Sequence, residues 1–141
     1  VTHVSGAGIA RVSTGAALPG LGGALAVRHV FVQHVHGGSV QFARSGPPVP
    51  TGAAVAYGLG STAGSSLHAS FAVVADGTIG LFDRASMLTL ENAVITGQQL
   101  GVALASTAAT SQPTFYDVVF LGNSADGPTV DPTLPEPFST P

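Results

Sequence analysis

Residues 67–106 read LHASFAVVADGTIGLFDRASMLTLENAVITGQQLGVALAS, and this stretch decides the fold class. Short apolar runs in it are separated by turns that contain glycine. Asp76-Gly77 separates the first two runs, and Thr96-Gly97 separates the next two. Because Asp-Gly between two apolar runs is a strong signal for a two-residue hairpin turn, the stretch predicts two consecutive antiparallel hairpins.

The rest of the chain continues this pattern of short strands and turns. We expect strands at residues 6–13, 24–36, 39–44, 53–59 and 114–121. Glycine and proline punctuate the segments between them, which leaves little room for uninterrupted helix. About eight or nine strands at this spacing predict an all-β fold, a single antiparallel β-sandwich or jelly roll. No internal repeat of fixed period is apparent in the sequence.

The C-terminal segment has a different composition. Residues 122–141 read GNSADGPTVDPTLPEPFSTP and contain five prolines. Proline has no N–H to donate to a sheet, so we divide the chain into a β-sandwich domain, 1–121, and an extended Pro-rich arm, 122–141. Val130, Leu134 and Phe138 are spaced four apart in this arm. They are the predicted partner-binding anchors.

Charge is scarce throughout the chain. Four arginines, no lysine and seven carboxylates leave only 8% of residues charged, against about 25% in an ordinary soluble domain. Such a chain is expected to cover much of its surface with other protein. No apolar run reaches the ~18 residues of a membrane-spanning helix, and the arginines are not clustered as a nucleic-acid site requires. We therefore expect a homo-oligomer with no membrane or nucleic-acid partner.

The sequence offers one candidate metal site and no catalytic motif. His34 and His36 are two positions apart, so in a strand both imidazoles project from one face. The alternative is a pair of ordinary histidines at a strand end, and this is the interpretation we adopt, with no metal and no cofactor. Neither a Gly-x-Ser-x-Gly elbow nor a His-Glu-x-x-His element occurs. The sequence therefore predicts a protein that is not an enzyme.

Two segments resemble known families. Residues 24–60 carry VRHVFVQ, a glycine turn, GSVQF and SGPPVPTG, and resemble small β domains of tailed-phage structural proteins. Residues 70–122 carry DGTIGLF, TGQQLGVAL and FYDVVF, and are similar to the closing hairpins of concanavalin A-like, or laminin-G-like, sandwiches. The first resemblance implies a virion structural protein, a capsid decoration (cement) protein bound to the major capsid protein or other virion proteins. Because decoration proteins commonly sit at three-fold positions, it also implies that the homo-oligomer is a closed trimer. The alternatives are a minor tail or fibre component, and a carbohydrate-binding β-sandwich module on a cell or virion surface.

Overall fold

The computed structural model describes residues 7–11, 24–37, 39–41, 49–51, 56–61, 65–105 and 113–130. Strands dominate these residues, as the alternation of apolar runs and turns predicts. The strands are β1 (Ala7–Arg11), β2 (Ala24–Gln33), β3 (Ser39–Gln41), β4 (Val49–Thr51), β5 (Tyr57–Ser61), β6 (Ser66–Ala75), β7 (Ile79–Asp83), β8 (Met87–Thr96), β9 (Leu100–Leu104), β10 (Thr114–Leu121) and β11 (Thr129–Val130). Within this described part of the chain, no helix has the length and apolar character needed to span a bilayer.

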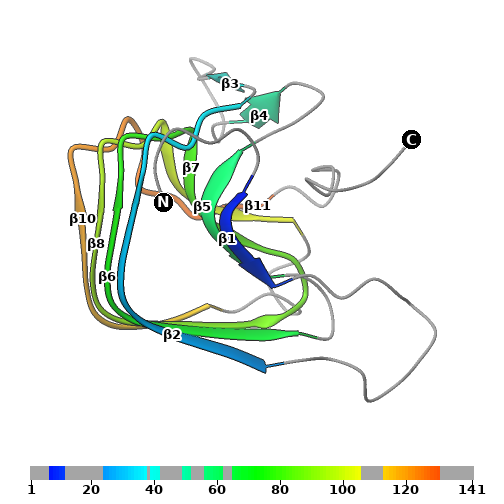
Figure 1. The fold of residues 1–141 in the computed structure, drawn as a ribbon. Coiled ribbons are helices and arrows are strands. Elements are labelled where there is room, and N and C mark those ends of the chain that lie inside the picture. The colour runs from blue at the N-terminus through cyan, green and yellow to red at the C-terminus, as the bar shows by residue number, and fades with distance from the viewer. Residues whose placement is uncertain are drawn as a thin grey trace.

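Two parallel sheets make up the body of the molecule. One has four strands in the order β10-β8-β6-β2, and the other has five in the order β1-β5-β7-β9-β11. From β5 to β11 the chain visits the two sheets in strict alternation, so each circuit adds one strand to each sheet. Every neighbouring pair within the two sheets is parallel. The fold is therefore a parallel β-helix, or solenoid, whose circuits follow one another around a common interior (Figure 1).

Successive circuits of the solenoid are similar in length, a regularity that the sequence analysis did not detect: Tyr57 of β5 pairs with Ile79 of β7, 22 positions further along, and Thr89 of β8 pairs with Thr114 of β10, 25 positions further along. Ser66 of β6 pairs with Met87 of β8, 21 positions further along the chain. Ile79 of β7 pairs with Leu100 of β9, again 21 positions further along. Between β2 and β6 the paired residues are 42 positions apart, because the intervening chain contains the antiparallel pair of β3 and β4.

The predicted antiparallel β-sandwich or jelly roll is therefore wrong, although the all-β class is correct. Asp76-Gly77 and Thr96-Gly97 do not close hairpins, because the strands on either side of each turn belong to different sheets. The physical reason lies in the turn residues. A positive φ suits a hairpin turn, but it suits a corner of a solenoid equally well. Asp76 has φ 52° and Gly97 has φ 63°, and both stand at corners.

Two columns of residues in the left-handed conformation shape each circuit. The first corner column bends the long strands of the four-stranded sheet midway, which gives them the L shape seen in Figure 1. Its members have φ between 49° and 53°: His29, Phe71, Asn92 and Asp117. The second corner column ends these strands and turns the chain toward the other sheet, and it consists of His34, Asp76, Gly97 and Gly122. Left-handed backbone costs a non-glycine residue about 1–2 kcal/mol, and stacking one corner on the next is what maintains it here.

The main core fills the space between the sheets. Its side chains form columns that follow the strand register, such as Val32, Val74 and Ile95, which are aligned across β2, β6 and β8. All three are buried. Gly80 of β7 faces this column, and a Cβ there would come within 2.6 Å of Ile95 Cγ2. The glycine thus allows the two sheets to approach closely.

A second core cluster belongs to the five-stranded sheet alone. It consists of Tyr57, Ile79, Phe82, Leu100, Ala103 and Ala105. Tyr57 and Phe82 stack with ring centroids 5.1 Å apart. Because the first cluster already takes side chains from the same strands, β5, β7 and β9 are buried on both faces. This burial explains why their sequences are apolar at consecutive positions rather than alternating.

The chain beyond β10 continues the solenoid as far as the structure describes it. The Asn123 amide donates to Ile95 O at 3.1 Å, and its Oδ1 accepts from the Gln98 N–H at 2.9 Å. The Gly101 N–H donates to Ala125 O, and β11 then pairs with β9. Residues 122–130, the first part of the predicted arm, therefore contact the preceding circuit, and residues 131–141 lie outside the described part of the chain.

Candidate functional site

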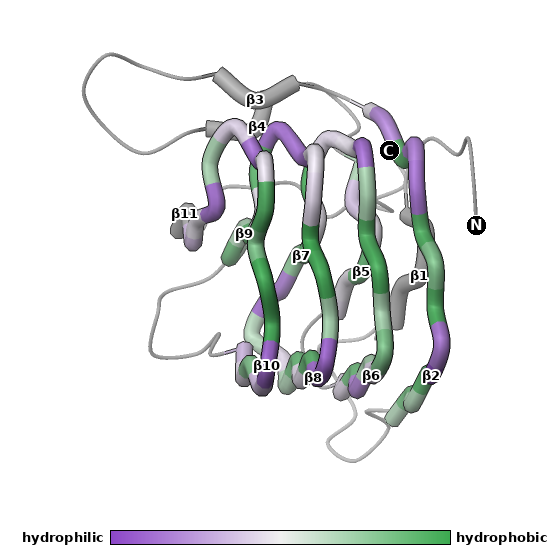
Figure 2. The backbone as a smooth tube through the Cα atoms, turned by 90° about the vertical axis from the view of Figure 1, so that its left-hand side faces the viewer, coloured by the Kyte–Doolittle hydropathy of each residue, from purple (hydrophilic) through white to green (hydrophobic). Residues whose placement is uncertain are grey.

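The four-stranded sheet carries the accessible apolar side chains, most of them on its outer face; Phe115 is the exception, since it is aligned with the buried core residue Leu90. Every large hydrophobic residue that is exposed, among those whose side chains the structure describes, lies on a strand of this sheet: Phe31, Phe71, Met87, Phe115, Tyr116, Val119 and Leu121. Four of these seven belong to β10 alone. Figure 2 shows the four strands side by side, with β10 and β2 at opposite edges of the sheet. A candidate binding surface is therefore to be sought on this face.

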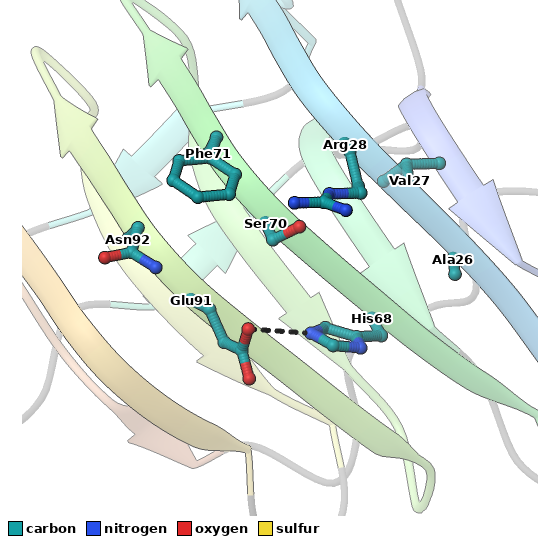
Figure 3. A pocket seen from close by; sticks show the side chains of 8 residues that line it. All are labelled: Ala26, Val27, Arg28, His68, Ser70, Phe71, Glu91 and Asn92. Carbon is teal, nitrogen blue, oxygen red and sulfur yellow. Dashed lines mark ion pairs between the residues drawn. The ribbon is translucent and has the colours of Figure 1, made fainter.

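A groove crosses three strands of this sheet beside the first corner column. It encloses about 370 Å³ and is lined by residues from β2, β6 and β8: Ala26, Val27, Arg28, His68, Ser70, Phe71, Glu91 and Asn92. We call it the outer groove (Figure 3). Strand register brings these residues together, since Arg28 is aligned with Ser70, and Ser70 with Glu91.

Charged groups and an aromatic ring share the outer groove. His68 Nε2 lies 3.3 Å from Glu91 Oε2, and their side chains are 49% and 36% exposed. The guanidinium carbon of Arg28 lies 5.5 Å from the centroid of the Phe71 ring. His29 stacks on Phe71 at 5.2 Å. The His68–Glu91 contact is an ion pair only when His68 is protonated, and an ion pair this exposed contributes only about 0–1 kcal/mol to stability.

The outer groove is equipped for binding polar molecules. Arg28 and Asn92 supply N–H donors, Glu91 supplies carboxylate oxygens, and Phe71 supplies an apolar ring face. The first corner column holds Phe71 and Asn92 in place, because their left-handed backbone fixes where each side chain leaves the sheet. The result is an open recess with donors, acceptors and one ring.

The histidine pair does not have the arrangement that its spacing predicts. β2 ends at Gln33, and His34 lies in the second corner column with φ 56°. The two residues are thus not alternate positions of one strand, and the rings of His34 and His36 lie 6.3 Å apart with a 31° tilt. No group of three or more His, Cys, Asp or Glu side chains with metal-site geometry occurs within the described residues.

The predicted anchors of the arm are placed only in part. Val130 lies in β11, which pairs with β9 at the end of the five-stranded sheet. Leu134 and Phe138 lie outside the described residues. Of the predicted site residues that the structure describes, none lines the outer groove.

Sequence reasoning missed the outer groove, although a signal for it exists. When Ser66–Gly77 is placed over Met87–Gln98, Ala72-Val73-Val74 matches Ala93-Val94-Ile95. This alignment, at the 21-residue offset of the sheet register, places Phe71 beside Asn92. Recognition of the repeat would have grouped these side chains.

Comparisons with known proteins add no relatives. No protein-family model matches the chain, and no match was found among curated proteins or solved structures. Functional inference accordingly depends on the chain's own residues and geometry.

Proposed function

We propose that this chain is a structural protein of a tailed-phage virion that acts through contacts between subunits, and that it is not an enzyme. The observation that carries the proposal is the row of exposed apolar side chains on β10. Tyr116, Val119 and Leu121 are each more than half exposed. A strand with such a surface at the edge of a sheet is a template for association with other protein.

The low charge of the chain supports the same proposal. With only 8% of residues charged, the surface lacks the mixed charges that keep a small domain dispersed. Burial of apolar surface contributes about 25 cal/mol per Å². Many repeated contacts of this kind stabilise a particle even when each one is modest.

The proposal includes two alternative locations in the virion, the capsid and the tail. A capsid decoration protein is the function that the phage-like segment implies, and its partners would be the major capsid protein and further copies of the chain. A minor tail or fibre component is the alternative. The parallel solenoid supports this alternative, because such a fold adds strands along one axis and can be lengthened by another repeat.

The test is the composition of purified particles. The virion proposal predicts that the chain is present in high, fixed copy number in particles of the virus that encodes it, as measured by quantitative mass spectrometry. Immunogold labelling then distinguishes capsid from tail. If the chain is expressed during infection but is absent from purified particles, the proposal is wrong.

A second candidate function is carbohydrate binding, which the outer groove favours. A sugar can bind where an aromatic ring face lies beside hydrogen-bond donors and acceptors. In the outer groove, Phe71 supplies the ring face, Arg28 the donors and Glu91 the acceptors. Titration calorimetry with host surface polysaccharides tests it. Binding that is lost in Arg28→Ala and in Glu91→Gln would support this function, whereas binding that both variants retain would place the sugar elsewhere.

A further inference from the structure

Among the described residues, the two ends of the solenoid are formed by different strands. Within the described residues, β2 pairs only with β6, and β10 pairs only with β8. In the five-stranded sheet, β1 and β11 occupy the corresponding edges. Figure 2 shows β2 and β10 at opposite edges of the same sheet. Each of these edges presents backbone groups on the side away from its neighbour, which is the usual starting point for strand addition.

The two end strands have the same shape. β2 bends at His29 with φ 53°, and β10 bends at Asp117 with φ 52°. Both residues belong to the first corner column, because their flanking residues are in register with those of the strands between them. An L-shaped strand accepts a neighbour along its whole length only if that neighbour bends at the same position. β2 and β10 meet this condition.

The side chains that face the interior are also complementary. Val118 and Phe120 of β10 are only half-buried, although they occupy core positions, since Val118 is aligned with Ala93 and Phe120 with Ile95. Val27 and Val30 of β2 are half-buried for the same reason at the other end. Continuing the register would place Val30 beside Val118. Apolar side chains would then meet apolar side chains at the contact.

The outward side chains match in charge. Continuing the register places His29 beside Asp117, and Arg28 beside Tyr116. An arginine next to an aspartate corner and a tyrosine ring gains Coulomb attraction and a cation–π contact. Phe31, which is 52% exposed, would lie beside Val119, which is 54% exposed. No like charges face one another in this register.

We propose that β10 of one copy binds β2 of a second copy in parallel, so that two solenoids continue head to tail. This inference rests on the proposed structural function. The partner that it names is a second copy of this chain. The contact joins two different surfaces, so it is heterologous and builds an open stack. It therefore differs from the closed trimer that the resemblance to decoration proteins implies, and experiment can distinguish the two.

The experiment measures the mass of the purified full chain by sedimentation velocity over the micromolar range. Head-to-tail stacking predicts a mass that rises with concentration in steps of 13.9 kDa. Val119→Asp should return the chain to a monomer, because its carboxylate would be desolvated against the apolar Phe31 of the next copy and gains no cation–π attraction there. Met87→Asp is the matched control, since Met87 is 71% exposed but lies on β8, one strand in from the edge. It should leave the association unchanged.

A second pair of variants, at Tyr116 and Arg28, tests the contact by weakening the association and then restoring it. Tyr116→Lys should weaken stacking because the new lysine faces Arg28 of the next copy, while within its own chain it lies beside Glu91 and leaves the fold intact. Adding Arg28→Glu should restore stacking. Circular dichroism verifies that every variant is folded. A wild-type monomer throughout the range, a trimer of fixed mass, or association that Val119→Asp and Tyr116→Lys leave intact would overturn the inference. None of these outcomes alters whether the chain is found in particles, so the proposed function is judged separately.

Discussion

Ile95 lies directly against Gly80: a Cβ built on the glycine would come within 2.6 Å of Ile95 Cγ2 and 2.8 Å of Gly101 O. The isoleucine is fully buried, and the second neighbour is backbone, so neither can withdraw freely. Gly80→Ala should therefore destabilise the protein by about 1–3 kcal/mol, the range for overpacking a core. Denaturant unfolding followed by circular dichroism measures it.

Gly122→Ala provides the contrast for this prediction. Gly122 has φ 65°, and a Cβ added there would meet nothing within 4 Å. Its substitution should cost only the left-handed conformation, about 1 kcal/mol. Equal stability of the Gly80→Ala and Gly122→Ala variants would show that the close approach of the sheets does not require a glycine at position 80.

The first corner column predicts a different response at an exposed residue. Asn92 has φ 49° on β8, and its side chain is exposed. Asparagine tolerates this conformation better than alanine. Asn92→Ala should lose about 1 kcal/mol of unfolding free energy, whereas Asn92→Gly should stay within about 0.5 kcal/mol of the wild type, because relief of strain offsets the greater freedom of the unfolded chain. An alanine variant as stable as the glycine variant would contradict a strained corner.

The sequence predicted where strands lie better than how they pair. Residues 114–121 were expected as a strand and form β10 over those residues. The pairing was wrong because Asp76-Gly77 satisfies a hairpin and a solenoid corner equally, and only strand register distinguishes the two. The 42-residue spacing between β2 and β6 also obscures the repeat, since the segment that contains β3 and β4 interrupts it.

The sequence analysis missed the outer groove for the same reason, because it did not identify the strand register. Arg28, His68 and Glu91 are far apart in the chain and become neighbours only through the register of three parallel strands. None of them belongs to a local motif. In contrast, the spacing of His34 and His36 predicted two positions of one strand, yet β2 ends at Gln33 and His34 stands at a corner with φ 56°.

The histidine pair predicts weak metal binding at most. Stable zinc sites in proteins use three or four ligands, and the described residues bring no third ligand to His34 and His36. Equilibrium dialysis of the full chain against zinc, followed by elemental analysis, should find no stoichiometric metal after buffer exchange. One metal per chain that disappears in the His34→Asn/His36→Ala variant would contradict this. Asparagine is chosen at position 34 because it tolerates the φ of 56° found there.

The final prediction concerns the chain after β10. Residues 122–130 contact the preceding circuit through Asn123 and through the pairing of β11 with β9. A chain that ends after Leu121 loses these hydrogen bonds, each worth about 0.5–1.5 kcal/mol net, and should unfold at a clearly lower temperature. A chain that ends after Val130 keeps them and is the matched control. Asn123→Ala in the full chain should lose about 1–3 kcal/mol, since it leaves the Gln98 N–H and Ile95 carbonyl without their amide partner. If the chain ending after Leu121 melted together with the one ending after Val130, residues 122–130 would not stabilise the solenoid, and the contacts of Asn123 would have no energetic consequence.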